Sequence, residues 1–217
     1  MEQELQELFN DAKIAFDKSP IKKFADDKSA KWAYTISSTE LQQGKNLLVE
    51  FNWEVESKQK YTAQEFIPTI NFKGLHLNKE LGSLQKIYRP LLEYFPAEEI
   101  DDAVRSNFCF FRSKQEDQLT QTDLDLSTPL FLKFIDIIKP KSIIGFSNNL
   151  KNYFIYHKLC SDLQKLEIPS NKRMLLVAKG IFKRHDQNIP IYFLPHPDAK
   201  LTSSARKEAW DFCFKEN

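Results

Sequence analysis

The chain has 217 residues, of which 41% are hydrophobic and 28% charged, and its formal net charge is +1. This is ordinary globular composition, so a mainly disordered chain is excluded, and we expect one domain spanning residues 1–217 rather than two very small ones. Only 5 glycines are present, and neither G-x-G-x-x-G nor G-x-x-x-x-G-K-[ST] occurs, which excludes the glycine-rich phosphate loops with those signatures.

The cysteines and the N-terminus indicate a reducing compartment. Cys109, Cys160 and Cys213 are odd in number, far apart and not arranged as a C-x-x-C zinc pair. The acidic start MEQELQELFNDAK is unlike a secretory signal, and no apolar run approaches the ~18 residues that span a bilayer. We therefore expect a cytoplasmic protein without a membrane span. We also expect a monomer that uses no metal or cofactor.

Charge is distributed unevenly along the chain. Residues 139–217 contain 14 Lys and Arg against 7 Asp and Glu, whereas the rest contains 17 basic and 23 acidic residues. A basic last third on a nearly neutral chain is compatible with a surface that faces an anion such as nucleic acid. A solvated helix face explains the same count without any partner.

The first half of the chain mixes regular elements with long irregular stretches. Residues 1–44 form an N-terminal lead-in whose helix is predicted by the spacing of Leu5, Leu8, Ala12 and Phe16. The remaining predictions are a short strand near 32–36, a buried strand from Asn46 to Phe51, an irregular segment over 53–79 with a short helix near 63–66, and a helix over 80–95 that Pro90 kinks or divides.

The second half alternates strands and helices more clearly. The patterns predict a strand over 103–111, a helix over 123–138 with a candidate start at Thr128-Pro129, a strand over 142–146, a helix over 148–163, strands over 174–182 and 189–194 joined by a polar turn, and a helix over 201–214 capped by Thr202 or Ser203.

This alternation predicts an α/β fold, a three-layer α/β/α sandwich with a mostly parallel central sheet. Ligands of such sheets gather beyond the carboxyl ends of the strands. Three polar positions are expected near such ends: Asn52, Asn107 and His196. The topology therefore predicts that they share one rim.

Each of these residues has a chemical and a purely structural interpretation. His196 stands between Pro195 and Pro197, which restrict its backbone and hold an imidazole at a strand end, or simply form a rigid turn. Asn52 can orient a water or grip an amide-like base edge, or close an Asx turn, and Asn107 has the same alternatives.

Several segments, in this order, resemble the uracil-DNA glycosylase superfamily, and most closely its single-strand-selective monofunctional branch. The similarity covers about residues 45–214 as short motifs. The segments are Glu50-Phe51-Asn52-Trp53-Glu54, resembling G-M-N-P-G; Ile70-Asn71-Phe72-Lys73-Gly74, resembling V-P-F-G; Asn107-Phe108-Cys109-Phe110-Phe111, resembling N-x-C-P-L; the strand from Lys139 to Gly145; and His196-Pro197-Asp198-Ala199-Lys200, resembling H-P-S-P-R, with Trp210 on the helix that follows.

The resemblance implies a base-excision hydrolase that flips uracil or a modified pyrimidine out of DNA and cleaves its N-glycosidic bond. It assigns water positioning to Asn52 and stabilisation of the leaving base to His196. The implied base contacts are Asn107, Phe72 and Trp53. The implied DNA contacts are Lys200, in place of an intercalating arginine, with Asp198 and Arg206.

The motifs also depart from the family pattern. Glu50 and Glu54 replace two glycines, Trp53 replaces a proline and Asp198 a serine. Side chains there fill space near the ligand, and carboxylates repel phosphate. A second reading is therefore a member of the fold that binds nucleic acid, a nucleotide or a protein without catalysis. A third is a small hydrolase with His196 as base, although no G-x-S-x-G motif is present.

Overall fold

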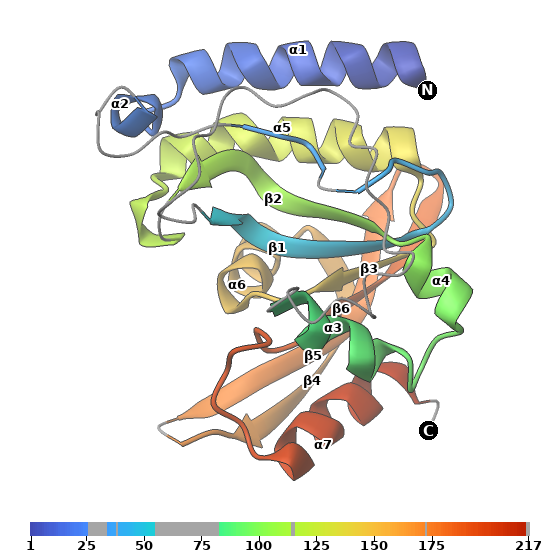
Figure 1. Cartoon of the computed structure of the whole chain (residues 1–217). Coiled ribbons are helices and arrows are strands. Elements are labelled where there is room, and N and C mark those ends of the chain that lie inside the picture. The colour runs from blue at the N-terminus through green and yellow to red at the C-terminus, as the bar shows by residue number, and fades with distance from the viewer. Residues whose placement is uncertain (26–33, 38, 55–82, 114–115, 172, 216–217) are drawn as a thin grey trace. The chain divides into compact units, whose positions relative to one another are not determined.

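Figure 1 shows the computed structural model of the chain, which describes all residues except 26–33, 38, 55–82, 114–115, 172 and 216–217. The chain forms two compact units. The first unit comprises Met1–Gly44, Glu50–Ile70 and Val104–Lys139, and the second comprises Lys45–Val49, Asn71–Ala103 and Pro140–Asn217.

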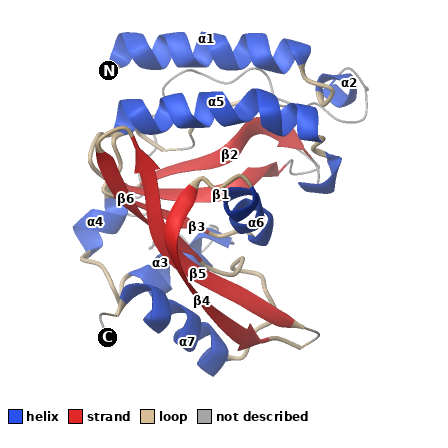
Figure 2. Cartoon of the chain, turned by 180° about the vertical axis from the view of Figure 1, so that it is seen from behind, coloured by secondary structure: helices blue, strands red, loops and turns tan. Residues whose placement is uncertain are grey.

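The strands form a six-stranded sheet in the order β2-β1-β3-β6-β5-β4. Their bounds are β1 Asn46–Glu54, β2 Val104–Ser113, β3 Ser142–Gly145, β4 Cys160–Pro169, β5 Met174–Arg184 and β6 Gln187–Phe193. β3 pairs in parallel with both β1 and β6, while β5 pairs antiparallel with β6 and β4. The sheet and its flanking helices confirm the predicted α/β class (Figure 2).

The second unit has helices on both faces of its strands. Its helices are α3 Ser83–Leu91, α4 Ala97–Asp101, α6 Asn148–Tyr156 and α7 Ser203–Phe214. The Phe193 ring of β6 lies 5.7 Å from that of Phe154 in α6, and the neighbouring Tyr192 ring lies 4.8 Å from that of Phe214 in α7. Adjacent strand residues point to opposite faces, so α6 and α7 cover opposite faces in an α/β/α arrangement.

The first unit is built on a phenylalanine core between β2 and α5. Its helices are α1 Glu2–Lys18, α2 Lys22–Ala25, the short 3₁₀ helix Glu116–Gln118 and α5 Gln121–Ile138. Phe108 and Phe110 of β2 pack edge to face on Phe131 and Phe134 of α5, at centroid distances of 5.3 and 5.8 Å. α1 runs alongside α5 (Figures 1 and 2), and its buried stripe of Leu5, Leu8 and Ala12 explains why the sequence forms a helix there.

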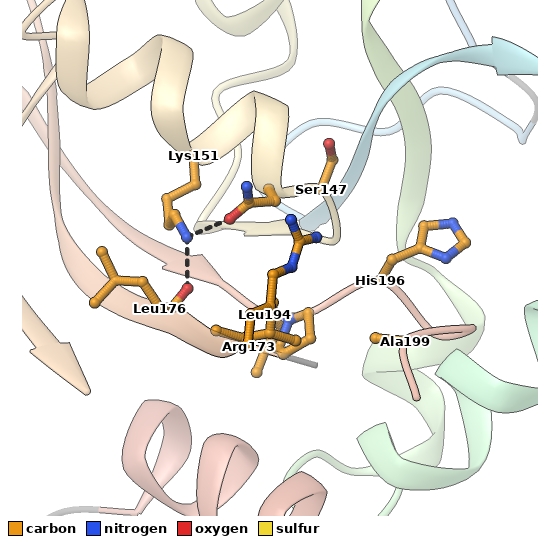
Figure 3. A pocket seen from close by; sticks show the side chains of 10 residues that line it. Ser147, Lys151, Arg173, Leu176, Leu194, His196 and Ala199 are labelled. Atoms are coloured by element: carbon orange, nitrogen blue, oxygen red, sulfur yellow. Dashed lines mark hydrogen bonds between the residues drawn. The ribbon is translucent and has the colours of Figure 1, made fainter. Parts of the chain in front are cut away.

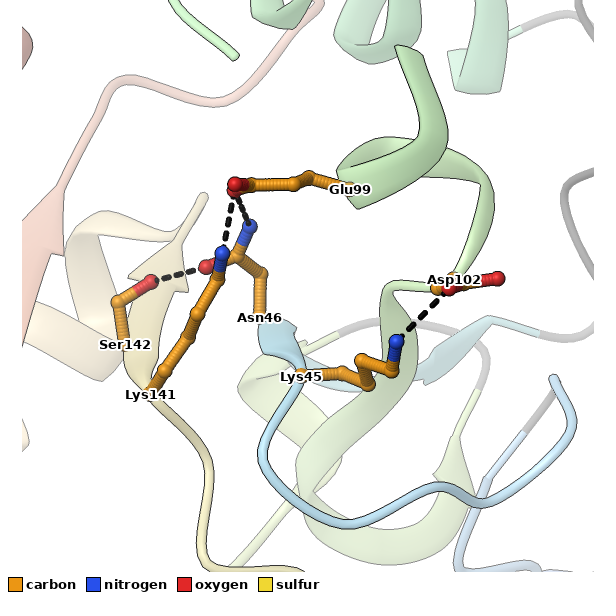
Figure 4. Close-up of polar contacts among 6 residues, drawn as sticks. All are labelled: Lys45, Asn46, Glu99, Asp102, Lys141 and Ser142. Atoms are coloured by element: carbon orange, nitrogen blue, oxygen red, sulfur yellow. Dashed lines mark hydrogen bonds and ion pairs between the residues drawn. The ribbon is translucent and has the colours of Figure 1, made fainter. Parts of the chain in front are cut away.

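A polar network joins α4 to the amino ends of β1 and β3 in the second unit (Figure 4). The Ser142 hydroxyl donates to Asn46 Oδ1 at 2.7 Å, and the Glu99 carboxylate accepts from Lys141. Lys45 and Asp102 form an ion pair of 2.8 Å. Partly exposed pairs contribute little individually, so this network positions α4 more than it stabilises the unit.

Most of the predicted elements are confirmed, including the N-terminal helix, the β5–β6 hairpin and the Thr202 cap of α7, which accepts from the Ala205 N–H. The predicted helix over 148–163 is too long: α6 ends at Tyr156, and β4 begins at Cys160. β4 escaped prediction because its register shifts between Ser161 and Gln164, which breaks the alternation that identifies a strand.

The bounds of other helices and strands also differ from the prediction. α3 ends at Leu91, one residue after Pro90 and short of the predicted end at residue 95, and α4 begins beyond the predicted helix, at Ala97. α5 begins at Gln121, before the candidate start at Thr128-Pro129, which lies inside the helix. Near 32–36, Tyr34 forms an isolated bridge to Phe111, while residues 26–33 and 53–79 lie wholly or largely outside the described residues.

The start of α5 is capped by a fully buried carboxylate. Asp123 and Thr120 form a reciprocal capping box, in which Asp123 Oδ2 accepts from the Thr120 N–H at 2.7 Å. Asp123 Oδ1 also accepts from the Ile21 N–H at 3.2 Å and from the Ser19 hydroxyl, both in the turn after α1. One side chain therefore joins α1 and α2 to α5.

We predict that Asp123→Ala lowers the free energy of unfolding by about 2–3 kcal/mol, because it removes the cap and leaves buried donors unsatisfied. Asp125→Ala, an exposed position on the same helix, is the control and should stay within about 0.5 kcal/mol of wild type. Urea unfolding of the three proteins measures the difference. Equal stabilities of the two variants would contradict this role.

Candidate functional site

The second unit contains a pocket at the carboxyl ends of β3 and β6. The two strands are parallel and continue into Phe146-Ser147 and into Leu194-Pro195-His196, respectively. A cavity of about 90 Å³ lies between these segments, the start of α6 and the start of β5 (Figure 3). Ligands of open α/β sheets bind beyond the carboxyl ends of the strands, and this pocket lies at such a place.

His196 stands at this pocket in a rigid turn. The Ala199 N–H donates to the His196 carbonyl oxygen at 2.8 Å, and the Asp198 N–H donates to His196 Nδ1 at 3.2 Å. Because Nδ1 accepts this bond, we assign the proton of the neutral ring to Nε2. The side chain is 41% exposed. The turn therefore presents an N–H donor to solvent beyond the end of β6.

The three predicted DNA contacts lie close to His196 along the chain. Asp198 and Lys200 are exposed. The Arg206 guanidinium reaches back from α7 and donates to the Ala199 carbonyl oxygen at 2.9 Å. Arg206 therefore braces the His196 turn in this structure.

Lys151 of α6 is the most unusual residue of the pocket. It is 2% exposed, and its ammonium donates to Asn148 Oδ1 and to the Leu176 carbonyl oxygen, both at 2.6 Å. Burial, together with repulsion from Arg173 and Lys165, lowers the pKa of Lys151 to about 8. Its acceptors are neutral oxygens, so the charge is solvated by dipoles rather than balanced by a carboxylate.

The rest of the lining is also free of negative charge. Arg173, in the turn immediately before β5, directs its guanidinium toward the beginning of α6, and the His196 ring turns away from Lys151 (Figure 3). None of the 10 described lining residues is acidic. Ser147 caps α6 through bonds from the Asn149 and Leu150 N–H groups, so a positive helix end adds to the field. The pocket is suited to an anion.

Asn52 and Asn107 lie in the first unit, and both are buried within strands. Asn52 is inside β1 rather than at its end, is 5% exposed, and donates from Nδ2 to the Ser113 hydroxyl at 2.5 Å. Asn107 is inside β2 and fully buried. With its amide oriented so that Nδ2 donates, it bonds the Asn52 and Glu50 carbonyl oxygens at 3.2 and 3.3 Å. The two asparagines thus meet in contacts between β1 and β2.

Of the two glutamates that replace glycines of the family motif, Glu50 takes part in an ion pair. Glu50 Oε2 lies 2.7 Å from the Arg105 guanidinium, and both side chains are 18% exposed. The Glu50 carboxylate is therefore neutralised locally and is not an isolated negative charge. The Trp53 and Glu54 side chains and the whole of Phe72 lie outside what the structure describes.

Lys151 and Arg173 were not selected from the sequence. A signal for Lys151 was present, because it lies between Leu150 and Phe154 on the buried side of α6, where an apolar residue is expected. Arg173 precedes a strand in a polar turn and carries no comparable signal. Only the pairing of β5 with β6 brings it to the pocket.

No protein-family model matches the sequence, and no curated protein matches it significantly. Within the described part of the chain, no helix is both long and apolar enough to cross a membrane. In that same part, no three His, Cys, Asp or Glu side chains are grouped so that they could hold a metal ion.

The low pKa of Lys151 predicts a pH-dependent stability. Lysine in the unfolded chain keeps its proton to about pH 10.4, whereas folded Lys151 loses it near pH 8, so the unfolded state binds more protons between these values. The free energy of unfolding should therefore rise by on the order of 2 kcal/mol from pH 7 to 9.5, relative to Lys151→Met. Urea unfolding at both pH values measures this. Parallel pH profiles of wild type and variant would contradict it.

Proposed function

We propose that the protein is a DNA glycosylase that hydrolyses the N-glycosidic bond of uracil or of a modified pyrimidine in DNA. The observation that carries this proposal is the His196 turn, which holds an imidazole with its proton on Nε2 at the carboxyl end of β6. A neutral N–H donor fixed beside a pocket is suited to an oxygen that becomes negative during reaction.

The chemistry requires no covalent intermediate with the protein. A water oxygen bonds to C1′ of the deoxyribose, and the C1′–N1 bond breaks with its electron pair moving onto the base. The base leaves as an anion whose charge spreads to a carbonyl oxygen, where His196 Nε2–H donates. A proton from the attacking water ends on the base, leaving free base and an abasic sugar. Asn52 is the residue proposed to orient that water, by resemblance to the family.

The charge of the last third of the chain is compatible with a nucleic acid substrate. Residues 139–217 carry an excess of basic side chains, and Lys200 is exposed four residues after His196. Such a surface attracts the phosphate backbone irrespective of sequence. The family resemblance is the basis for proposing uracil or a modified pyrimidine as the base. The His196 turn is the basis for proposing that an N–H donor stabilises the leaving base.

We predict that the purified chain releases uracil slowly from single- or double-stranded oligonucleotides, revealed by alkaline cleavage at the abasic site. His196→Ala should lower the rate by about 10²–10³-fold, because it removes one donor to the leaving group. Asn52→Ala should also lower it. His185→Ala, at an exposed histidine in the β5–β6 turn, is the control and should retain the wild-type rate.

The burial of the two asparagines favours a second candidate function, binding of nucleic acid without hydrolysis. Asn52 and Asn107 use their amides for contacts between β1 and β2, and a side chain that is 5% exposed has little access to solvent water. If the folded protein forms no abasic product from uracil or from other modified pyrimidines, hydrolysis is excluded, and the binding function then depends on a measured affinity for single-stranded DNA.

Both functions predict salt-dependent affinity for single-stranded DNA. Each neutralised phosphate contributes about −0.7 to the slope of log affinity against log salt concentration, so three contacts give roughly −2. Lys200→Gln should make the slope shallower by about 0.7, while Lys13→Gln on α1 of the first unit should leave it unchanged. Fluorescence anisotropy over a salt series measures the slopes. A slope near zero would show that phosphate is not contacted.

A further inference from the structure

We infer that Lys151, Arg173 and the first turn of α6 form a binding site for a phosphate group. This site goes beyond the proposed hydrolysis at His196, because it recognises the anion rather than the base.

Lys151 carries a positive charge that is removed from water. Burying an ammonium away from water costs free energy unless an opposite charge is paired with it. When one member of a buried ion pair is removed, the other is left uncompensated, which is strongly unfavourable. Lys151 is 2% exposed, and its two bonds, both of 2.6 Å, go to the neutral oxygens of Asn148 and Leu176. A carboxylate is missing from the described lining of the pocket, so an anion in the pocket would supply the absent counter-charge.

A second cation faces the same cavity. Arg173 is exposed, lines the pocket and lies close enough to Lys151 to lower the pKa of its ammonium by repulsion. Two like charges held together without a ligand destabilise each other, and a bound anion attracts both of them and offsets their repulsion. Lys165 of β4 adds to the same repulsion.

The arrangement of the positive groups favours a phosphate group. Two charged donors come from different elements, an ammonium from α6 and a guanidinium from the turn before β5 (Figure 3). The Asn149 and Leu150 N–H groups already donate to the Ser147 hydroxyl, so the amino end of α6 contributes its positive field rather than these donors. A phosphate group can accept from the ammonium and the guanidinium through different oxygens while it lies in this field. The cavity of about 90 Å³ has room for a group the size of a few water molecules.

The test is a titration of the intact chain with inorganic phosphate at constant ionic strength, followed through the backbone amide signals of α6 in ¹⁵N–¹H spectra. We expect saturable shifts at Asn148 to Lys151 in the wild type. Arg173→Gln should weaken the affinity at least fivefold, and Lys151→Met should abolish saturation. Lys158→Gln, at an exposed lysine just after α6, is the matched control and should stay within twofold of wild type.

Arg173 is exposed, so Arg173→Gln keeps the inference testable even if Lys151→Met folds poorly. The absence of saturable shifts in the wild type would overturn the inference. Unchanged affinity in Arg173→Gln, or equal affinity for acetate and phosphate, would overturn it too. The titration contains no base and no glycosidic bond, so its outcome is separate from that of the cleavage assay.

Two further ligands identify where the phosphate comes from. An octathymidylate without terminal phosphates carries only backbone diesters, and a 5′-mononucleotide carries only a monoester. Affinity at least tenfold above that of inorganic phosphate for the octamer assigns the site to a nucleic acid backbone. The same gain for the mononucleotide alone assigns it to a free nucleotide.

Discussion

The parallel pairing of β3 with β1 on one side and β6 on the other is the constraint on which the pocket depends. Parallel neighbours end at the same edge, so the segments after Gly145 and Phe193 emerge together. Gly145 makes the close approach of α6 possible. A Cβ at this position would lie 2.7 Å from Leu150 Cδ2 and 3.2 Å from Phe193 Cδ1, so a larger residue would force the buried Leu150 side chain, and to a smaller extent the Phe193 ring, to move.

That close approach also explains why Lys151 is buried. Leu150 and Phe154 pack toward the sheet, and Lys151 lies beside them on the turn of α6 that meets β5. The Asn148 and Leu176 oxygens solvate its charge, but neutral oxygens stabilise an ammonium less than a carboxylate does. Burial and repulsion from Arg173 and Lys165 lower the pKa of Lys151, and in our proposal the unbalanced positive charge gives the pocket its affinity for an anion.

The first unit uses its polar residues differently, for internal support. Asp123 satisfies donors from two segments of the chain, and Asn107 bonds the backbone of β1 from the interior of β2. The ion pair of Glu50 and Arg105 lies next to these asparagine contacts in sequence and has the same character. Buried polar groups whose hydrogen bonds are satisfied fix the alignment of strands. The residue type alone does not distinguish this structural role from a functional one.

The sequence by itself determined the α/β class, most strands and helices, and the position of His196 after the last parallel strand. These follow from apolar periodicity, capping residues and the fixed backbone of a histidine between prolines, all of which act over a few neighbouring residues. The edge strand β4 was missed because a register shift hides its alternation. Only the tertiary structure decided that Asn52 and Asn107 are buried inside strands and that Lys151 and Arg173 share a pocket. Burial and charge pairing depend on segments distant in sequence, and no local pattern encodes which of these segments meet.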